Sequence, residues 1–160
     1  MFFKAGEEAA LHYMDVDTVH HNADKKRIGM VYAHCLCHVG DYYPPGYKKR
    51  ATPVGFGSVT HTWIEGLLDY YFLTEYRRSL ETAEKIANLY ARYQTVNYDF
   101  RNCREPSWHL ILMMAAYNAT GNEFYLNAAR IIVERVLERQ DPETGGWIRH
   151  LIPGTPSMHS

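Results

Sequence analysis

The sequence contains no long hydrophobic run and carries almost no net charge. No stretch of about 18 apolar residues occurs, so we expect no transmembrane helix and no membrane partner. The formal net charge of −1 lacks the basic excess typical of nucleic-acid-binding proteins, so no nucleic-acid partner is expected either. The opening residues MFFKAGEEAA place acidic side chains where a signal peptide is apolar, so none is predicted.

Cysteine and the common cofactor motifs are scarce as well. Cys35, Cys37 and Cys103 form an odd set without a disulfide framework, which mildly favours a reducing compartment and so a cytoplasmic location. Neither a glycine-rich phosphate loop nor a G-x-S-x-G motif occurs, and we predict no cofactor.

Aromatic side chains are the feature that the sequence has in excess. Its 160 residues are 46% hydrophobic and 22% charged, a composition typical of one soluble globular domain. The 13 Tyr, 6 Phe and 3 Trp include several near turns and polar residues. A dry core would not hold all of them, so some are expected outside it.

Helical periodicity organises the middle of the chain. Within residues 58–93, apolar side chains recur at three- and four-residue steps in two stripes, and each stripe predicts an amphipathic helix. Residues 73–77 are predicted to form a short turn, which makes the segment an antiparallel helical hairpin. The stripes contain Trp63, Leu67, Leu68, Tyr71 and Phe72, then Leu80, Ala83, Ile86, Ala87 and Tyr90.

The same pattern recurs at an offset of 46 residues. Repetition of helix, turn and helix at such a period is typical of stacked hairpins and toroids. We therefore predict an all-α fold of helical hairpins with long ordered loops. The offset pairs Tyr71 with Tyr117, Thr74 with Thr120, Leu80 with Leu126, Ala83 with Ala129 and Ile86 with Ile132.

The second hairpin differs from the first in its turn and in its first helix. Gly121, which suits a left-handed C-cap, stands where the first hairpin has Glu75, so one shared turn conformation is not predicted. The first helix, predicted over 108–119 after Pro106, is apolar nearly all round, which favours enclosure by neighbours. Its partner is predicted over about 123–140, before a Gly-Gly turn.

The segments outside the hairpins are predicted with less regular structure. Residues 3–13 form a short helix or the tail of an earlier element, 14–27 a polar loop, 28–39 a buried helix and 40–58 a long aromatic loop. The chain stops without a closing hairpin, whereas stacked hairpins need capped ends or ring closure. We therefore expect one partial domain, spanning 1–160, that packs with the remaining domains of a longer parent chain.

The strongest candidate site lies at the start of the first hairpin. His61, Trp63 and Glu65 lie close together in sequence, with Asp69 one turn after Glu65. Carboxylates and an imidazole beside an aromatic ring suit acid/base chemistry on a sugar, because the ring stacks on a pyranose. Alternatively, His61 belongs to the cap region, Trp63 to the core, and the carboxylates are solvated near the positive helix end.

A second candidate is the polar loop. Asp15, Asp17, His20 and His21 gather without an apolar stripe, which suggests a catalytic or cation-binding site. The alternative is an Asx-turn loop with hydrogen-bonded side chains.

His34 and His38 share one face of the predicted 28–39 helix, and Cys35 and Cys37 lie between them. Structural zinc normally needs a second, separated ligand pair, which is missing. We favour cysteines that are small buried hydrophobes and predict no metal, while the two histidines stay candidates for a cleft.

Arginine and tyrosine side chains provide a last set. Because Arg binds a carboxylate in a bidentate fork, they could line a groove for an acidic sugar. Alternatively they are ordinary surface residues. The set contains Arg101, Arg104 and Arg149 with Tyr42, Tyr43, Tyr47 and Tyr98.

Several of these motifs resemble the (α/α)-toroid, or six-hairpin, carbohydrate-active enzymes. HTWIEGLLDYYFLT, AAYNATGNEFYLNAA and ERQDPETGGW are similar to successive hairpins of that family. DVDTVHHN, AHCLCH and SVTHTWIEGL most resemble the toroid domain of exo-rhamnogalacturonan lyase and YetA-like proteins. The resemblance covers residues 15–147, but a full ring needs more hairpins than the two clear ones here.

The resemblance implies a substrate cleft at the centre of the ring, reached by loops before the inner helices. It implies that His61, Trp63, Glu65 and the 15–21 loop are cleft residues. Our catalytic candidates are His61, Glu65 and Asp17, and our substrate-binding candidates are Trp63, His20, His21, His34, His38, Tyr43, Tyr70, Arg104 and Trp147.

We therefore expect a fragment of an enzyme that cleaves acidic, pectin-like polysaccharides or oligosaccharides, such as rhamnogalacturonan. In a lyase, an Arg would neutralise the uronate while His61 or a Tyr removes the C5 proton. In a hydrolase, Glu65 or Asp17 would be the general acid. The alternative is a non-catalytic helical-repeat module that binds a glycan or a protein on its concave face.

Overall fold

The structure is a computed structural model that describes residues 1–31, 59, 62–94 and 104–147. Within these ranges the regular elements are helical and none is a β-strand, so the predicted all-α class is confirmed for them. An isolated antiparallel bridge joins Thr18 to Val31. Most of the predicted 28–39 helix and the whole 40–58 loop lie outside the described residues.

Five α-helices make up most of the described chain. None of them is both long enough and apolar enough to cross a lipid bilayer. Two π-helical turns, η1 and η4, and one 3₁₀ turn, η2, accompany them. The elements are α1 (Phe2–His12), η1 (Tyr13–Asp17), η2 (Lys25–Arg27), α2 (Glu65–Thr74), α3 (Arg77–Leu89), η4 (Tyr90–Gln94), α5 (Arg104–Thr120) and α6 (Glu123–Leu137).

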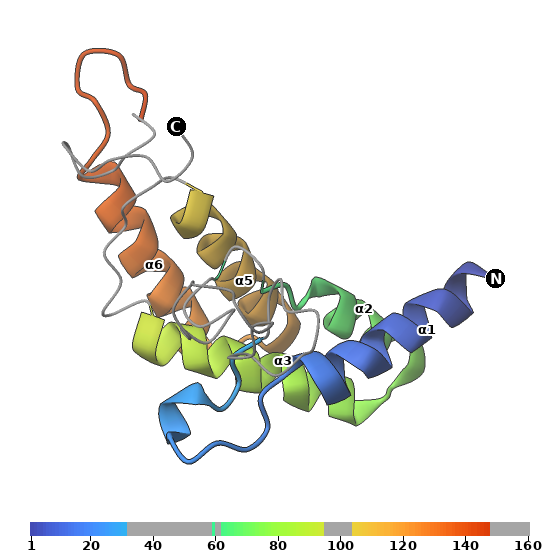
Figure 1. The fold of residues 1–160 in the computed structure, drawn as a ribbon. Helices are drawn as coiled ribbons and strands as arrows, with labels where there is room; N and C mark the ends of the chain where they lie inside the picture. The colour runs from blue at the N-terminus through green and yellow to red at the C-terminus, as the bar shows by residue number, and fades with distance from the viewer. Residues whose placement is uncertain (32–58, 60–61, 95–103, 148–160) are drawn as a thin grey trace, which may run out of the picture.

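The helices are arranged as two consecutive pairs. α2 and α3 pack against each other across a two-residue turn, and so do α5 and α6. Figure 1 shows α1 beside the first pair, and α5 and α6 side by side next to α3. Contacts of α3 with α5 and of η4 with α6 join the two pairs. The α3 helix is therefore packed by its own partner and by the second pair.

The two turns have the same geometry at the 46-residue offset. Glu75 and Gly121 are both left-handed, with φ of 59° and 68°, and each N–H donates to the carbonyl four residues earlier at 2.7 Å. Thr74 and Thr120 each donate a hydroxyl hydrogen bond to the carbonyl four residues earlier, and each accepts an N–H two residues later. The shared threonine, with its hydroxyl between two backbone groups, accompanies the turn in both pairs even where no glycine is present.

Burial follows the repeat along the early part of α3 and α6. Ala83 and Ile86 of α3 are completely buried, and their equivalents Ala129 and Ile132 of α6 are buried too. Because these positions lie three residues apart, they share one buried face of each helix.

The repeat differs in the later part of α6. Ala87 and Ala91 are buried in the first pair, whereas their equivalents Val133 and Leu137 are 38% and 54% exposed. The second pair packs on the later part of α3, where the Tyr125 hydroxyl donates to Asn88 at 3.3 Å. Nothing among the described residues covers the matching surface of α6 to the same degree.

Several boundaries and faces differ from the sequence predictions. Residues 14–17, predicted as loop, continue from α1 as η1, because Met14 is completely buried and holds this turn in the core. The α6 helix ends at Leu137, a few residues before the predicted end. Phe72, predicted in the apolar stripe, is 61% exposed. The α5 helix is not enclosed on all sides within the described structure, since Ile111 is 43% exposed.

Residues 18–31 form a loop that packs on α3. Val19 donates its N–H to the Met30 carbonyl, and Gly29 donates to the Val19 carbonyl, each at 2.8 Å. Gly29 has a φ of 93°, and a Cβ atom there would lie 2.7 Å from the Lys85 carbonyl oxygen of α3. This approach therefore requires glycine.

We expect Glu75→Gly to stabilise the protein. Left-handed backbone costs a non-glycine residue about 1–2 kcal/mol. Glycine gives back about 0.4–1 kcal/mol of that through the entropy of the unfolded chain. The net gain of about 0.5–1 kcal/mol should raise Tm by roughly 1–4 °C in thermal unfolding. Gly121→Ala is the matched control and should lower Tm, because it places a Cβ atom on left-handed backbone. That Cβ atom would contact nothing within 4 Å, so the change in Tm reports the backbone conformation alone. An unchanged Tm for both variants would contradict the shared turn geometry.

We expect Gly29→Ala to destabilise the protein by more than about 2 kcal/mol, because it adds left-handed strain to a clash with backbone atoms. Gly6→Ala is the control, since Gly6 is within α1 and a Cβ there meets nothing within 4 Å. It should stabilise by about 0.5–1 kcal/mol. Urea unfolding measures both changes. If Gly29→Ala left the free energy of unfolding unchanged, the loop would not pack on α3 as described.

Candidate functional site

Two tryptophan rings, one from each helix pair, lie against each other. Trp63 precedes α2 by two residues and Trp108 lies near the start of α5, with ring centroids 5.5 Å apart at an angle of 53°. Trp63 is 47% exposed and Trp108 is half-buried. We call Trp63 and Trp108 the tryptophan platform. It is open to solvent and is held by the beginnings of both pairs.

The hydroxyl of Tyr13 lies beside the tryptophan platform. It accepts the backbone N–H of Trp63 at 3.3 Å. Burial is the main cause that raises the pKa of Tyr13 above 10, and the hydrogen bond from Trp63 opposes it in part. The charges of Tyr90, Asp17 and Glu65 raise this pKa further. Tyr13 is therefore protonated at neutral pH, and both carboxylates are near enough to act on it.

The two carboxylates come from different elements. Asp17 ends η1 and its Oδ1 lies 3.7 Å from Nε2 of His12. Glu65 is the first residue of α2, and its Oε2 accepts the N–H of Ile64 at 3.0 Å. Asp69, one turn further along α2, is exposed. The structure therefore brings the predicted residues Asp17, Trp63 and Glu65 to one region around Tyr13.

The first turn of α5 carries two charged residues near Trp108, the cation Arg104 and the carboxyl group of Glu105. Arg104 is exposed and lies four residues before Trp108, so the two residues share a helix face. Glu105 is half-buried, and burial raises the pKa of its carboxyl above the ordinary value of 4.5. A carboxyl group that holds its proton to higher pH is what a general acid requires.

Buried polar side chains lie beneath the tryptophan platform. Thr62 and Tyr90 are both completely buried, and their hydroxyl groups share a hydrogen bond of 3.0 Å. The Tyr90 ring meets the ring of His109 edge-on at 5.9 Å. Burial lowers the pKa of His109 to about 4, although a hydrogen bond to the Tyr90 backbone opposes this shift. His109 is therefore neutral at physiological pH, and its contact with Tyr90 joins α5 to η4 beneath the tryptophan platform.

The two histidines of the 18–31 loop, His20 and His21, are not part of the region around Tyr13. Lys85 can only donate, so Nδ1 of His20 accepts from its ammonium group at 3.0 Å, and Nε2 carries the proton that it donates to the Met14 carbonyl. His20 thus ties the 18–31 loop to η1 and α3. His21 is exposed.

Tyr70 and Trp147 form contacts between elements. The Tyr70 hydroxyl donates to Glu7 at 2.9 Å and its ring lies against Phe3, which holds α1 on α2. The Trp147 indole N–H donates to the Val136 carbonyl at 2.9 Å, which ties the segment after α6 back to that helix. Neither residue contacts the tryptophan platform in the described structure.

Four further candidates, His34, His38, Tyr43 and His61, lie outside the described residues. Within the described ranges, no three His, Cys, Asp or Glu side chains form a group that could hold a metal ion.

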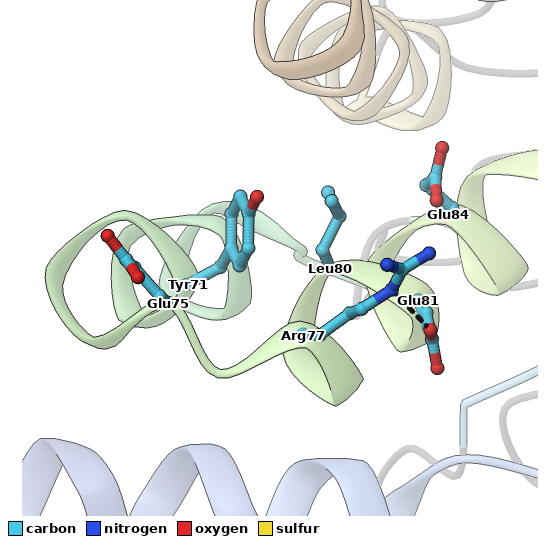
Figure 2. Close-up of a pocket in the computed structure, with 6 residues that line it drawn as sticks. All are labelled: Tyr71, Glu75, Arg77, Leu80, Glu81 and Glu84. Carbon is cyan, nitrogen blue, oxygen red and sulfur yellow. Dashed lines mark hydrogen bonds and ion pairs between the residues drawn. The ribbon is translucent and has the colours of Figure 1, made fainter.

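Two surface depressions lie along α3 and not at the tryptophan platform. The first, of about 510 Å³, contains the ion pair of Arg77 with Glu81 at 3.0 Å (Figure 2). The second, of about 610 Å³, shares Glu81 and Glu84 with the first and continues toward Arg92. The first is lined by Tyr71, Glu75, Arg77, Leu80, Glu81 and Glu84.

No protein-family model matches the chain, and neither a curated protein nor a solved structure matches it.

Sequence reasoning missed Tyr13, Glu105 and the role of Trp108. Trp63 lies just before the first helix of its pair and Trp108 lies near the start of the first helix of the other pair, and this similar position could have identified Trp108. No local pattern indicates that Tyr13, fifty residues before Trp63, would reach its backbone.

We expect His109 to make stability depend on pH between 6.5 and about 4. Its pKa is 6.5 when unfolded and about 4 when folded, so the unfolded chain binds more protons in this window. The free energy of unfolding is unaffected by this group above pH 6.5 and falls by about 3 kcal/mol on acidification to pH 4.

His109→Gln should remove this part of the pH dependence, whatever its effect on stability at pH 7. Urea unfolding of both proteins at a series of pH values isolates the histidine, because the carboxylates titrate equally in both. Equal slopes between pH 4 and 6.5 would show that His109 is not buried in neutral form.

Proposed function

We propose that this chain is part of a carbohydrate-active enzyme of the (α/α)-toroid class that cleaves acidic, pectin-like polysaccharides or oligosaccharides. The observation that carries the proposal is the exposed tryptophan platform with Asp17 and Glu65 beside Tyr13. Indole rings that are half open to solvent suit the apolar face of a sugar ring, because they bury it without losing much side-chain freedom. Carboxyl groups at the same place supply the acid and base that glycoside cleavage needs.

The arrangement of the helices supports the toroid class. Two consecutive helix pairs repeat at one offset with the same turn, which is how stacked hairpins build arrays and rings. Trp63 lies two residues before the first helix of its pair, and Trp108 lies near the start of the first helix of the other pair. In a toroid this is the end at which the inner helices meet the substrate cleft.

The chemistry of the site is compatible with two cleavage reactions. For hydrolysis, Glu105 would protonate the leaving oxygen, while Asp17 or Glu65 would act as base or nucleophile. For β-elimination, Arg104 would neutralise the uronate carboxylate and His61 would remove the C5 proton. The raised pKa of Tyr13 keeps its hydroxyl group protonated, so this group can donate a hydrogen bond but is not the base.

The rival function is a non-catalytic helical-repeat module that binds a glycan or a protein. It is favoured by the position of the two depressions, which lie along α3 and not at the tryptophan platform. A module of this kind would bind the same ligands without forming products.

We expect the full-length protein to release products from rhamnogalacturonan or polygalacturonate. A lyase forms an unsaturated product that absorbs in the ultraviolet, and a hydrolase forms reducing ends without that absorbance. Glu65→Gln or Asp17→Asn should reduce kcat by about 10²–10⁴-fold if the residue is the acid or base.

Trp63→Ala should reduce kcat/KM by about tenfold or more through lost stacking. Phe72→Ala is the matched control, since Phe72 is an exposed aromatic residue of α2 away from the platform, and it should leave kcat/KM unchanged. Binding of the glycan by the unaltered protein without either product would reject the enzyme and favour the binding module.

A further inference from the structure

The α6 helix carries an exposed apolar stripe along one side. Leu126, Val133 and Leu137 are separated by seven and four residues, so they share one face of the helix. Val133 and Leu137 are 38% and 54% exposed, and Leu126 is half-buried. We call these three residues the α6 stripe. In Figure 1, α6 lies at the edge of the described fold with its partner α5 on one side, and this edge position leaves the stripe open to an occupant.

The corresponding part of the first helix pair is covered. At the 46-residue offset, Val133 and Leu137 correspond to Ala87 and Ala91, which are buried where the second pair packs on the first. The distance between packed helix axes varies from about 8 to 10 Å with the size of the side chains at the contact. Valine and leucine in place of alanine therefore do not permit a contact as close as the one on α3. The α6 stripe suits a helix whose own large apolar side chains interdigitate with it.

Charged side chains form a row beside the α6 stripe. Arg130 and Glu134 are exposed, lie one turn apart and are on the same side of the stripe. The Arg130 guanidinium donates to Asn127 at 2.9 Å and lies 3.9 Å from the Glu123 carboxylate. Glu134 has no ion-pair partner within the part of the chain that the structure describes. The row thus offers a cation and an unpaired carboxylate next to the apolar contact.

Two copies of α6 complement each other when they are antiparallel. A two-fold axis midway between antiparallel helices places their charged rows on the same side of the contact. With the axis at the level of Ile132, Arg130 of one copy faces Glu134 of the other, because the two positions are equally distant from the axis. The same arrangement brings Leu137 beside Leu126 of the second copy, since their distances from the axis differ by only one residue. By symmetry, each of these contacts forms twice.

We propose that α6 is a self-association surface, on which α6 of a second copy of this chain binds in the antiparallel direction. A second copy is the occupant that fits, because the α6 stripe and the charged row are each complementary to themselves. The apolar contact drives association, and the two pairs of Arg130 with Glu134 set its register. A single 15-residue helix from each copy buries less than the roughly 1,200–2,000 Å² of a standard interface. We therefore expect a weak dimer, with a Kd of about 10–100 µM.

Sedimentation velocity of the 160-residue chain, from about 2 to 500 µM, tests the self-association. The unaltered chain should change from monomer to dimer over this range. Leu137→Glu should raise Kd at least about tenfold, because it places a carboxylate in the apolar contact. Leu73→Glu is the matched control, since Leu73 is 73% exposed near the end of α2, and it should leave Kd unchanged. An unaltered Kd for Leu137→Glu, or a loss of the dimer in Leu73→Glu, would overturn the proposal.

Exchanging the two charges tests the antiparallel register. Arg130→Glu or Glu134→Arg alone places like charges opposite each other and should raise Kd about five- to tenfold. The double variant Arg130→Glu/Glu134→Arg restores opposite charges and should return Kd to within about twofold of the unaltered value. A double variant as weak as either single variant would overturn the antiparallel arrangement. An unaltered chain that stays monomeric at the highest concentration would overturn self-association and leave the α6 stripe to another helix pair of the parent chain. None of these residues belongs to the tryptophan platform, so the proposed function stands or falls separately.

Discussion

The close packing around α3 is the constraint on which the rest of the structure depends. Ala83, Ile86 and Ala87 are completely buried, so neighbouring elements approach this helix without a gap. The Ser79 hydroxyl donates to the Leu67 carbonyl at 2.7 Å, which satisfies a polar group inside this contact. On the other side, only a glycine at position 29 lets the 18–31 loop lie on the α3 backbone. Ala83 and Ala87 on α3 and Gly29 on the loop are small residues at these contacts, and they let the neighbouring elements pack closely on this helix.

The candidate site depends on this packing because its supports are buried. The hydrogen bond between Thr62 and Tyr90 fixes the segment before α2 to the end of α3, and His109 joins α5 to the same place. Trp63 can stay half-exposed because these buried groups, and not the indole itself, determine its position. Rigid support beneath an open aromatic surface lowers the entropy cost of binding a ligand there.

The sequence predicted well those features that depend on local periodicity and poorly those that depend on distant contacts. The helices around Ala83 and Ala129 followed from three- and four-residue spacing. The turn at Glu75 was not predicted to match Gly121, because left-handed backbone at a glutamate shows only in the structure. His20 was assigned to a site, but its bonds to Met14 and Lys85 join elements that the sequence separates widely. Composition shows that a residue is polar, but it does not show which group the residue meets.

The hydrogen bond from Trp63 to Tyr13 joins the chain's first helical segment to the aromatic surface. Tyr13 directly continues α1, whose Glu7 is bound by Tyr70 of α2. The position of the indole and the attachment of the N-terminal helix are therefore thermodynamically linked. A ligand that favours the present orientation of Trp63 also favours an attached α1, and by reciprocity a loosened α1 weakens that ligand. The N-terminal segment is thus an energetic component of the site, although only its last residues come near it.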